Sequence, residues 1–251
     1  MVKPFFEMFL NDLGHAWQAG EDECTGTVEV VDELCLPGTT TLRAGVLASI
    51  ADIVSGALSN RAIAPRIPLT VDLTVHTLRP TTGATVAMTA RNLKVGRSMI
   101  VSETWFEDDG GPVAVSHSTF MASPRPEDVM ERVFWGRAPA PHNLTAPILD
   151  QIGARRVSPG VVELDRVPYV MQPSGTIQGG AIALVAELAA ESLVDAPIAD
   201  LEIRYLSTVR VGPARASATL LGDGLIRVEV RDAGNDDRLA TLVMARPATS
   251  A

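Results

Sequence analysis

The chain contains an internal repeat, and each copy is centred on an apolar helical segment that carries a single carboxylate. The two segments read PGTTTLRAGVLASIADIVSGAL at 37–58 and QPSGTIQGGAIALVAELAAESL at 172–193. An acid follows a glycine by seven residues in both, Gly45 to Asp52 and Gly180 to Glu187, so the copies are offset by 135. An acid inside an apolar helix is costly to bury. Its recurrence at one position indicates an inherited site.

The repeat continues into the segments that follow the helices. VDLTVHTLRP at 71–80 and DLEIRYLS at 200–207 alternate apolar and polar residues, which is typical of half-buried strands. In the first copy, one strand face is predicted to carry Val71, Leu73 and Val75. In the second copy, at an offset of 128, the corresponding strand face is predicted to carry Leu201, Ile203 and Tyr205. An almost wholly apolar helix must be covered on most sides. A curved antiparallel sheet folded around each helix meets that requirement.

The length of 251 residues fits two domains of about 125 residues each. Four prolines and mixed charges predict a linker at 123–142, with a short helix near 127–134. We therefore expect an N-terminal domain at 1–122 and a C-terminal domain at 143–251. A short strand is expected before each helix, near 26–32 and 160–167.

Composition and motifs exclude several classes of protein. The net charge of −9 argues against a nucleic-acid surface. Cys24 and Cys35 form no metal or disulfide pattern and are predicted to be core residues. The chain has no P-loop, G-x-S-x-G or H-E-x-x-H sequence, and its histidines share no ligand spacing. The N-terminal segment lacks the apolar stretch of a signal peptide. We expect a cytoplasmic protein that binds neither membrane nor nucleic acid.

The phrase G-T-x-x-G-G before a sheet-wrapped helix resembles the hotdog fold. Two copies resemble a double hotdog, an α+β pseudo-dimer in which two curved antiparallel sheets each wrap around a central helix. More narrowly, 149–190 resembles the PaaI-like acyl-CoA thioesterases, whose hallmark is a polar residue, then G-T-x-H-G-G, then an acid seven residues past the second glycine. The matching positions here are Gln172, Gly175, Thr176, Gln178, Gly179, Gly180 and Glu187. The family histidine is Gln178 in one copy and Arg43 in the other, so the copies are not equivalent.

The resemblance implies a composite site, because in that family one hotdog supplies the helix acid and a Ser or Thr eighteen residues later. The other hotdog supplies the helix N-terminus and the preceding polar residue. Carried over, the catalytic residues are Asp52, Thr70 and the Gly179 amide, and the substrate-binding residues are Gln172, Gln178 and Gly180. The reverse pairing fails, since Ile198 stands where a hydroxyl is needed and Pro37 replaces Gln172. Glu187 and Arg43 are the second-copy counterparts, and Glu187 is expected to be either a relic or a partner for Arg43 across the interface rather than a catalytic group.

This arrangement suits thioester hydrolysis. The first amides of a helix are unpaired and lie at its positive end, so they can stabilise an oxyanion. Asp52 would act as a general base or as a nucleophile, and the sequence leaves both open. No metal or organic cofactor is required. The resemblance implies an acyl-CoA substrate, and we expect a homo-oligomer such as a dimer of double hotdogs.

Other interpretations remain open at the level of sequence. The altered family histidines also fit a non-catalytic protein that binds acyl-CoA or an acyl chain. Gln172 and Gln178 could only cap the second helix. Three arginines could meet the phosphates of coenzyme A or be solvated strand charges, namely Arg79, Arg91 and Arg97.

Overall fold

Two long helices dominate the helical content of the computed structural model, which describes residues 8–125, 127, 129 and 135–248. They are α1 (Ala44–Ile63) and α3 (Gly179–Val194), while α2 (Ile148–Gln151) is a single turn. The first seven strands are β1 (His15–Ala19), β2 (Glu23–Glu29), β3 (Pro68–Thr77), β4 (Thr85–Val95), β5 (Met99–Asp108), β6 (Gly111–Ala122) and β7 (Gly136–Arg137). The others are β8 (Arg155–Ser158), β9 (Val161–Leu164), β10 (Ile198–Tyr205), β11 (Ala214–Gly222), β12 (Leu225–Asp232) and β13 (Arg238–Pro247).

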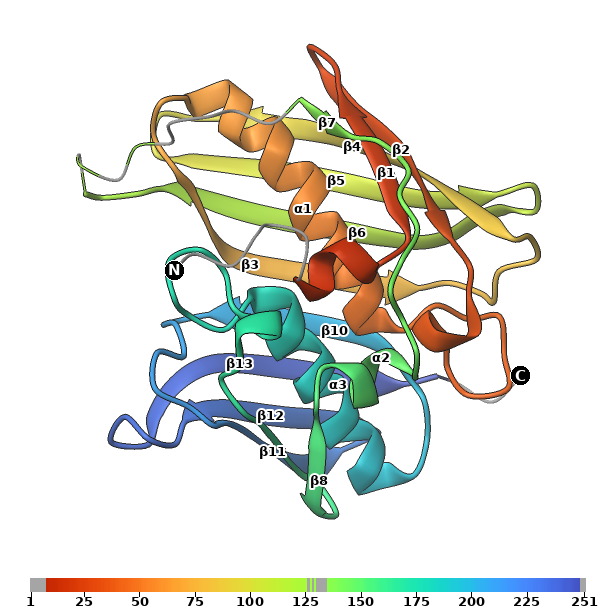
Figure 1. Ribbon diagram of the computed structural model, residues 1–251, viewed down its shortest axis with the longest axis vertical. Coiled ribbons are helices and arrows are strands. Elements are labelled where there is room, and N and C mark those ends of the chain that lie inside the picture. The colour runs from red at the N-terminus through yellow and green to blue at the C-terminus, as the bar shows by residue number, and fades with distance from the viewer. Residues whose placement is uncertain (1–7, 126, 128, 130–134, 249–251) are drawn as a thin grey trace.

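The strands of the described residues form one thirteen-stranded antiparallel sheet in the order β7-β1-β2-β4-β5-β6-β3-β10-β13-β12-β11-β9-β8. Its first seven strands curve around α1 and its other six around α3, so that each helix lies against its own half of the sheet (Figure 1). The predicted double hotdog fold is confirmed. The two halves are joined edge to edge through β3 and β10 rather than forming separate sheets.

The seam between β3 and β10 lies on the pseudo-twofold axis of the repeat. Thr74 pairs with Glu202, and Glu202 is the residue of the second copy that corresponds to Thr74 at the offset of 128. Pairing begins at His76 and Asp200 and ends at Asp72 and Arg204. The guanidinium Nε of Arg204 lies 3.0 Å from Oδ2 of Asp72. Beyond that ion pair, β3 and β10 are no longer paired with each other.

The two helices pack closely at small residues near their N-termini. A Cβ placed on Gly45 would lie 2.9 Å from Cα of Leu184, and one on Gly180 would overlap Ser49. Ser49 and Leu184 are counterparts at the offset of 135, so the crossing is symmetric. By length and composition α1 could span a membrane, but 67% of its most apolar 18-residue stretch is buried inside the protein, as expected of a core helix.

Parts of the sheet lie in places that the sequence pattern did not predict. The segment expected to be a linker supplies β7, which pairs with β1 along the edge of the first half (Figure 1). β1 and β8 have only five and four residues. Such short strands give too few alternating positions for a periodic signal. β2 and β9 correspond to the short strands expected before each helix, and the helix expected near 127–134 falls mostly outside the described residues.

Candidate active site

A cavity of about 390 Å³ lies where β3 and β10 part beyond the seam. Residues 67–71 line it from the start of β3, and 205–209 line it from the end of β10. The helices and the loop before α3 supply Asp52, Gln172, Ile177, Gln178, Gly179 and Ile182, and β13 supplies Thr241. Both halves of the chain therefore contribute to its wall.

Five of the eight residues predicted from the sequence line this cavity, namely Asp52, Thr70, Gln172, Gln178 and Gly179. Gly180 is not among the lining residues, and its Cα lies against Ser49 at the helix crossing. Arg43 and Glu187 also lie outside it and contact each other at the N-terminus of α1. The structure thus brings the two predicted half-sites together and separates their second-copy counterparts from them.

A β-bulge places Thr70 against Asp52. The register of β3 on β6 pairs Thr70 with Phe120 and then Asp72 with Thr119, which leaves Val71 without a partner. Val71 was predicted to share one strand face with Leu73 and Val75, and this was wrong because Val71 lies in the bulge. Thr70 instead points toward α1 and donates its hydroxyl to Oδ1 of Asp52 at 2.7 Å.

The environment of Asp52 suits a group that accepts a proton near neutral pH. Burial raises the pKa of its carboxyl to about 6, and the hydrogen bond from Thr70 opposes that rise. A general base is most effective when its pKa lies near the working pH. The carboxylate is therefore available above about pH 6, and Thr70 holds one of its two oxygens.

The N-terminus of α3 presents unpaired backbone donors. Among the described residues, the N–H groups of Gly179 and Gly180 have no hydrogen-bond acceptor. Gln178 occupies the N-cap position, yet its side chain makes no capping bond. The side-chain amide of Gln172 donates to the hydroxyl of Thr176 in the loop before the helix. Neither glutamine caps α3, so its first amides remain available to an anion.

Sequence reasoning missed the part that Tyr205 plays in this cavity. It was placed only on the core face of its strand, at the position now seen at the end of β10. Its hydroxyl donates to the carbonyl oxygen of Gly179 at 3.1 Å. Burial, with a smaller effect from the charge of Asp52, raises the pKa of Tyr205 well above its ordinary value. A usable signal existed, because a tyrosine hydroxyl at a core-facing position must find a partner.

The N-terminus of α1 is closed by an acid from the other half. The N–H of Ala44 donates to Oε1 of Glu187 at 3.2 Å, and the N–H of Gly45 donates to Oε2 at 3.0 Å. Nη1 of Arg43 lies 3.6 Å from the same carboxyl and 3.0 Å from Glu191. Burial raises the pKa of Glu187, while Arg43 and the two amides oppose that rise. The expected contact between Arg43 and Glu187 is observed.

One difference between the two half-sites is the length of the acidic side chain. Asp52 and Glu187 are counterparts, but glutamate is longer by one methylene group. Glu187 reaches the amides of the opposite helix, whereas Asp52 is held by Thr70 and makes no bond to Gly179 or Gly180. One helix N-terminus is filled from within the protein, and the other opens into a cavity.

Other candidate groups are occupied or inert. Arg79 donates two hydrogen bonds to Asp108, and Nη2 of Arg91 lies 3.0 Å from Glu23, so each already has an acidic partner. Burial raises the pKa of Cys24 to about 12 and is the main cause that raises that of Cys35 to about 11. Within the described ranges, no cluster of three or more His, Cys, Asp or Glu side chains could hold a metal ion.

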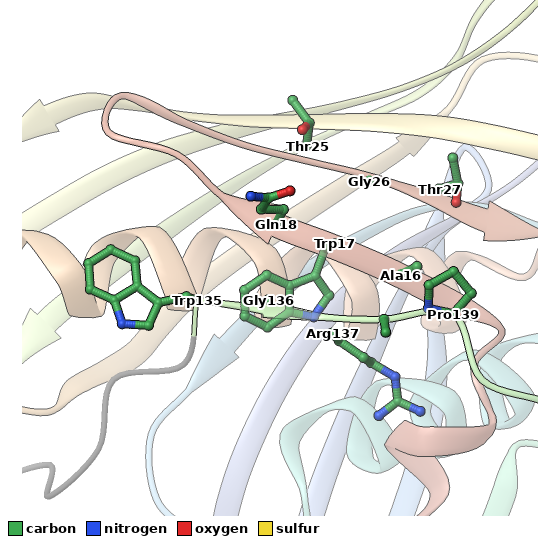
Figure 2. A pocket seen from close by; sticks show the side chains of 11 residues that line it. Ala16, Trp17, Gln18, Thr25, Gly26, Thr27, Trp135, Gly136, Arg137 and Pro139 are labelled. Atoms are coloured by element: carbon green, nitrogen blue, oxygen red, sulfur yellow. The ribbon is translucent and has the colours of Figure 1, made fainter.

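A larger and more open hollow of about 580 Å³ lies on the outer edge of the first half. Figure 2 shows its wall, which includes Trp17 on β1, Trp135, and Arg137 on β7. No carboxylate, histidine or cysteine lines it, and none of the residues predicted from the sequence does. The cavity between β3 and β10 is therefore the candidate active site.

Comparisons with known proteins agree with this architecture. Residues 41–115 match the family described as the thioesterase superfamily. A search of curated proteins found no match. Many solved structures are similar to this chain, and three of them illustrate the likeness. The tesB protein of Mycobacterium avium subspecies paratuberculosis is 14% identical, with a TM-score of 0.62 over 96% of this chain and 98% of that chain.

The second is an acyl-ACP thioesterase from Bacteroides thetaiotaomicron, 14% identical, with a TM-score of 0.60 over 89% of this chain and 97% of that chain. The third is a protein with a hot dog fold from Alicyclobacillus acidocaldarius, 15% identical, with a TM-score of 0.60 over 97% and 99% of the two chains. At these identities the likeness establishes the fold shared by the three.

Proposed function

We propose that the chain is an acyl-CoA thioesterase of the PaaI-like kind, with one composite active site between its two hotdog halves. The match of 41–115 to the thioesterase superfamily and the names of the similar structures support thioester hydrolysis. The observation that carries the proposal is the asymmetry of the two helix N-termini. Asp52, whose carboxyl has a raised pKa, and Gly179, whose amide is unpaired, line one cavity, while the equivalent helix N-terminus is blocked by Glu187.

The proposed mechanism places the thioester carbonyl oxygen at the N-terminus of α3. Its oxygen gains negative charge in the transition state, and the Gly179 amide is positioned to stabilise that charge. A single donor of this kind contributes about 2.7–4 kcal/mol in other enzymes. The glycine lets a substrate approach the backbone closely.

Asp52 is proposed to act as the general base or as the nucleophile of the hydrolysis. As a general base it takes a proton from water, the resulting hydroxide adds to the carbonyl carbon, and the C–S bond then breaks. The thiolate leaves and takes up the proton, giving a free acid and a free thiol. As a nucleophile, Asp52 would instead form a mixed anhydride that water hydrolyses. Thr70 holds the carboxylate in either case.

The experiment is a screen of acyl-CoA thioesters of increasing chain length, with the released thiol measured by a colorimetric reagent. Wild-type protein is expected to release thiol catalytically, and Asp52→Asn is expected to lose that activity while remaining folded. Stoichiometric acyl-CoA binding without turnover would instead identify a non-catalytic binding protein. No binding and no turnover across the series would contradict both functions.

A further inference from the structure

Tyr205 connects the end of β10 to the first residue of α3. It is the first residue of β10 past the seam, and it remains paired with Thr241 of β13. Its hydroxyl donates to the Gly179 carbonyl at 3.1 Å. Its ring covers the same residue, since a Cβ on Gly179 would lie 3.3 Å from two ring carbons. The side chain therefore contacts Gly179 through both its hydroxyl and its ring.

This contact fixes the peptide group between Gly179 and Gly180, which directly follows the Gly179 amide that the proposed chemistry uses. The carbonyl of Gly179 and the N–H of Gly180 belong to one planar peptide unit, so holding the oxygen also sets the direction of the N–H. Helix ends fray unless something holds them, and the N-cap side chain of Gln178 makes no capping bond. Tyr205 is thus positioned to hold the first peptide of α3 still.

The repeat gives independent support. At the offset of 128, the counterpart of Tyr205 is Thr77, a much shorter side chain. The N-terminus of α1, on that side, is occupied instead by the carboxylate of Glu187. The long hydroxyl-bearing side chain is present only where the helix amides are left open.

We propose that Tyr205 is a positioning residue for thioester hydrolysis, which orients the first peptides of α3 so that their amides can stabilise the oxyanion. This inference rests on the proposed function. Because burial keeps the Tyr205 phenol neutral at ordinary pH, its hydroxyl stays a donor to Gly179 throughout the range in which Asp52 is ionised. Tyr205 acts through the backbone of α3.

The test uses a matched pair, since the chain has only two tyrosines. Tyr169 donates its hydroxyl to Oδ2 of Asp12 at 2.7 Å and does not line the cavity. Each variant removes one hydroxyl: Tyr205→Phe removes the donor to the Gly179 carbonyl, and Tyr169→Phe removes the donor to the Asp12 carboxylate. We expect Tyr205→Phe to lower kcat by about tenfold, less than the loss of a whole oxyanion donor, with KM within about twofold. Tyr169→Phe is expected to lower Tm and leave kcat unchanged.

A second variant keeps the test decisive if Tyr205→Phe does not fold. Gly179→Ala places a methyl group against the Tyr205 ring and is expected to lower kcat, whereas Gly56→Ala has 3.6 Å to its nearest neighbour and serves as the control. Wild-type kcat in folded Tyr205→Phe, or in Gly179→Ala, would overturn the inference while leaving thioester hydrolysis intact. A wild-type protein that hydrolyses no thioester would refute the proposed function itself.

Discussion

Asp52 and Glu187 occupy equivalent positions, yet only the longer side chain reaches the opposite helix. Glu187 accepts hydrogen bonds from Ala44 and Gly45, and Asp52 accepts one from Thr70. The length of this acidic side chain is therefore one reason why one helix N-terminus is filled by the protein and the other is left open. The same carboxylate chemistry gives a structural contact in one half and a candidate catalytic group in the other.

This difference predicts that Asp52→Glu is inactive although it preserves the carboxylate. The added methylene should let the acid reach the amides of Gly179 and Gly180 and occupy the position of the oxyanion. We expect kcat to fall at least about 100-fold, as when an oxyanion donor is removed. Steady-state kinetics on the best acyl-CoA substrate measures this, with Glu187→Asp as the control that should keep its activity. A near-normal kcat in Asp52→Glu would contradict the account of the open site.

The hydrogen bond from Thr70 predicts a shift in the pH profile. Activity needs ionised Asp52, so kcat should rise with pH through about 6 in the wild type. The bond from Thr70 lowers the pKa of Asp52, and Thr70→Val removes it. The acidic limb of the kcat profile should therefore move to higher pH. An unchanged limb, or one displaced to lower pH, would mean that the titrating group is not Asp52.

At the scale of single elements, the two glycines of α1 face different surroundings. Gly45 lies at the crossing with α3, whereas a Cβ on Gly56 would lie 3.6 Å from the ring of Phe120, an ordinary van der Waals distance. Gly45→Ala should destabilise the fold by about 1–3 kcal/mol because its methyl group meets Leu184 and Glu187. Gly56→Ala should stabilise it by up to about 1 kcal/mol through helix propensity. Chemical denaturation of both variants checks this, and equal effects would contradict the packing described for α1 and α3.

The helices and central strands could be predicted because they are long and periodic. The bulge at Val71 could not, since it breaks the alternation only where β3 meets β6. β7 could not be predicted either, because it forms only by pairing with β1, more than a hundred residues earlier. The family resemblance placed Asp52 and Thr70 in one candidate site, and the structure shows a hydrogen bond between them. The contact of Tyr205 with Gly179 was missed, since it joins a strand end to a helix end.

At the scale of the whole molecule, the candidate site exists only because two halves of one chain are joined. The cavity takes Asp52 and Thr70 from the first half and the start of α3 from the second. We propose that 1–122 and 143–251 are the two domains and that neither forms the site alone. Duplication within one chain lets the two halves diverge, so that Glu187 fills one helix N-terminus while the other remains open.

The central claim is that Asp52 is catalytic and Glu187 is structural. Asp52 has a folded-state pKa of about 6, above its ordinary value of 3.8, so the folded protein binds more protons than the unfolded chain between these values. Its ionisation therefore lowers stability as pH rises through 6. Asp52→Asn should raise Tm at pH 8, with a smaller gain near pH 4. Glu187→Gln should lower Tm, because it replaces one of the two oxygens that accept from buried amides by an NH2 donor.

The most direct measurement is kcat for these two variants on one acyl-CoA substrate at pH 8, with Tm recorded for each. The account predicts that Asp52→Asn loses hydrolysis while staying as stable as the wild type or more so. It predicts that Glu187→Gln keeps most of its kcat with a lower Tm. Equal loss of activity in both variants, or loss in Glu187→Gln alone, would contradict the assignment of a single site to Asp52.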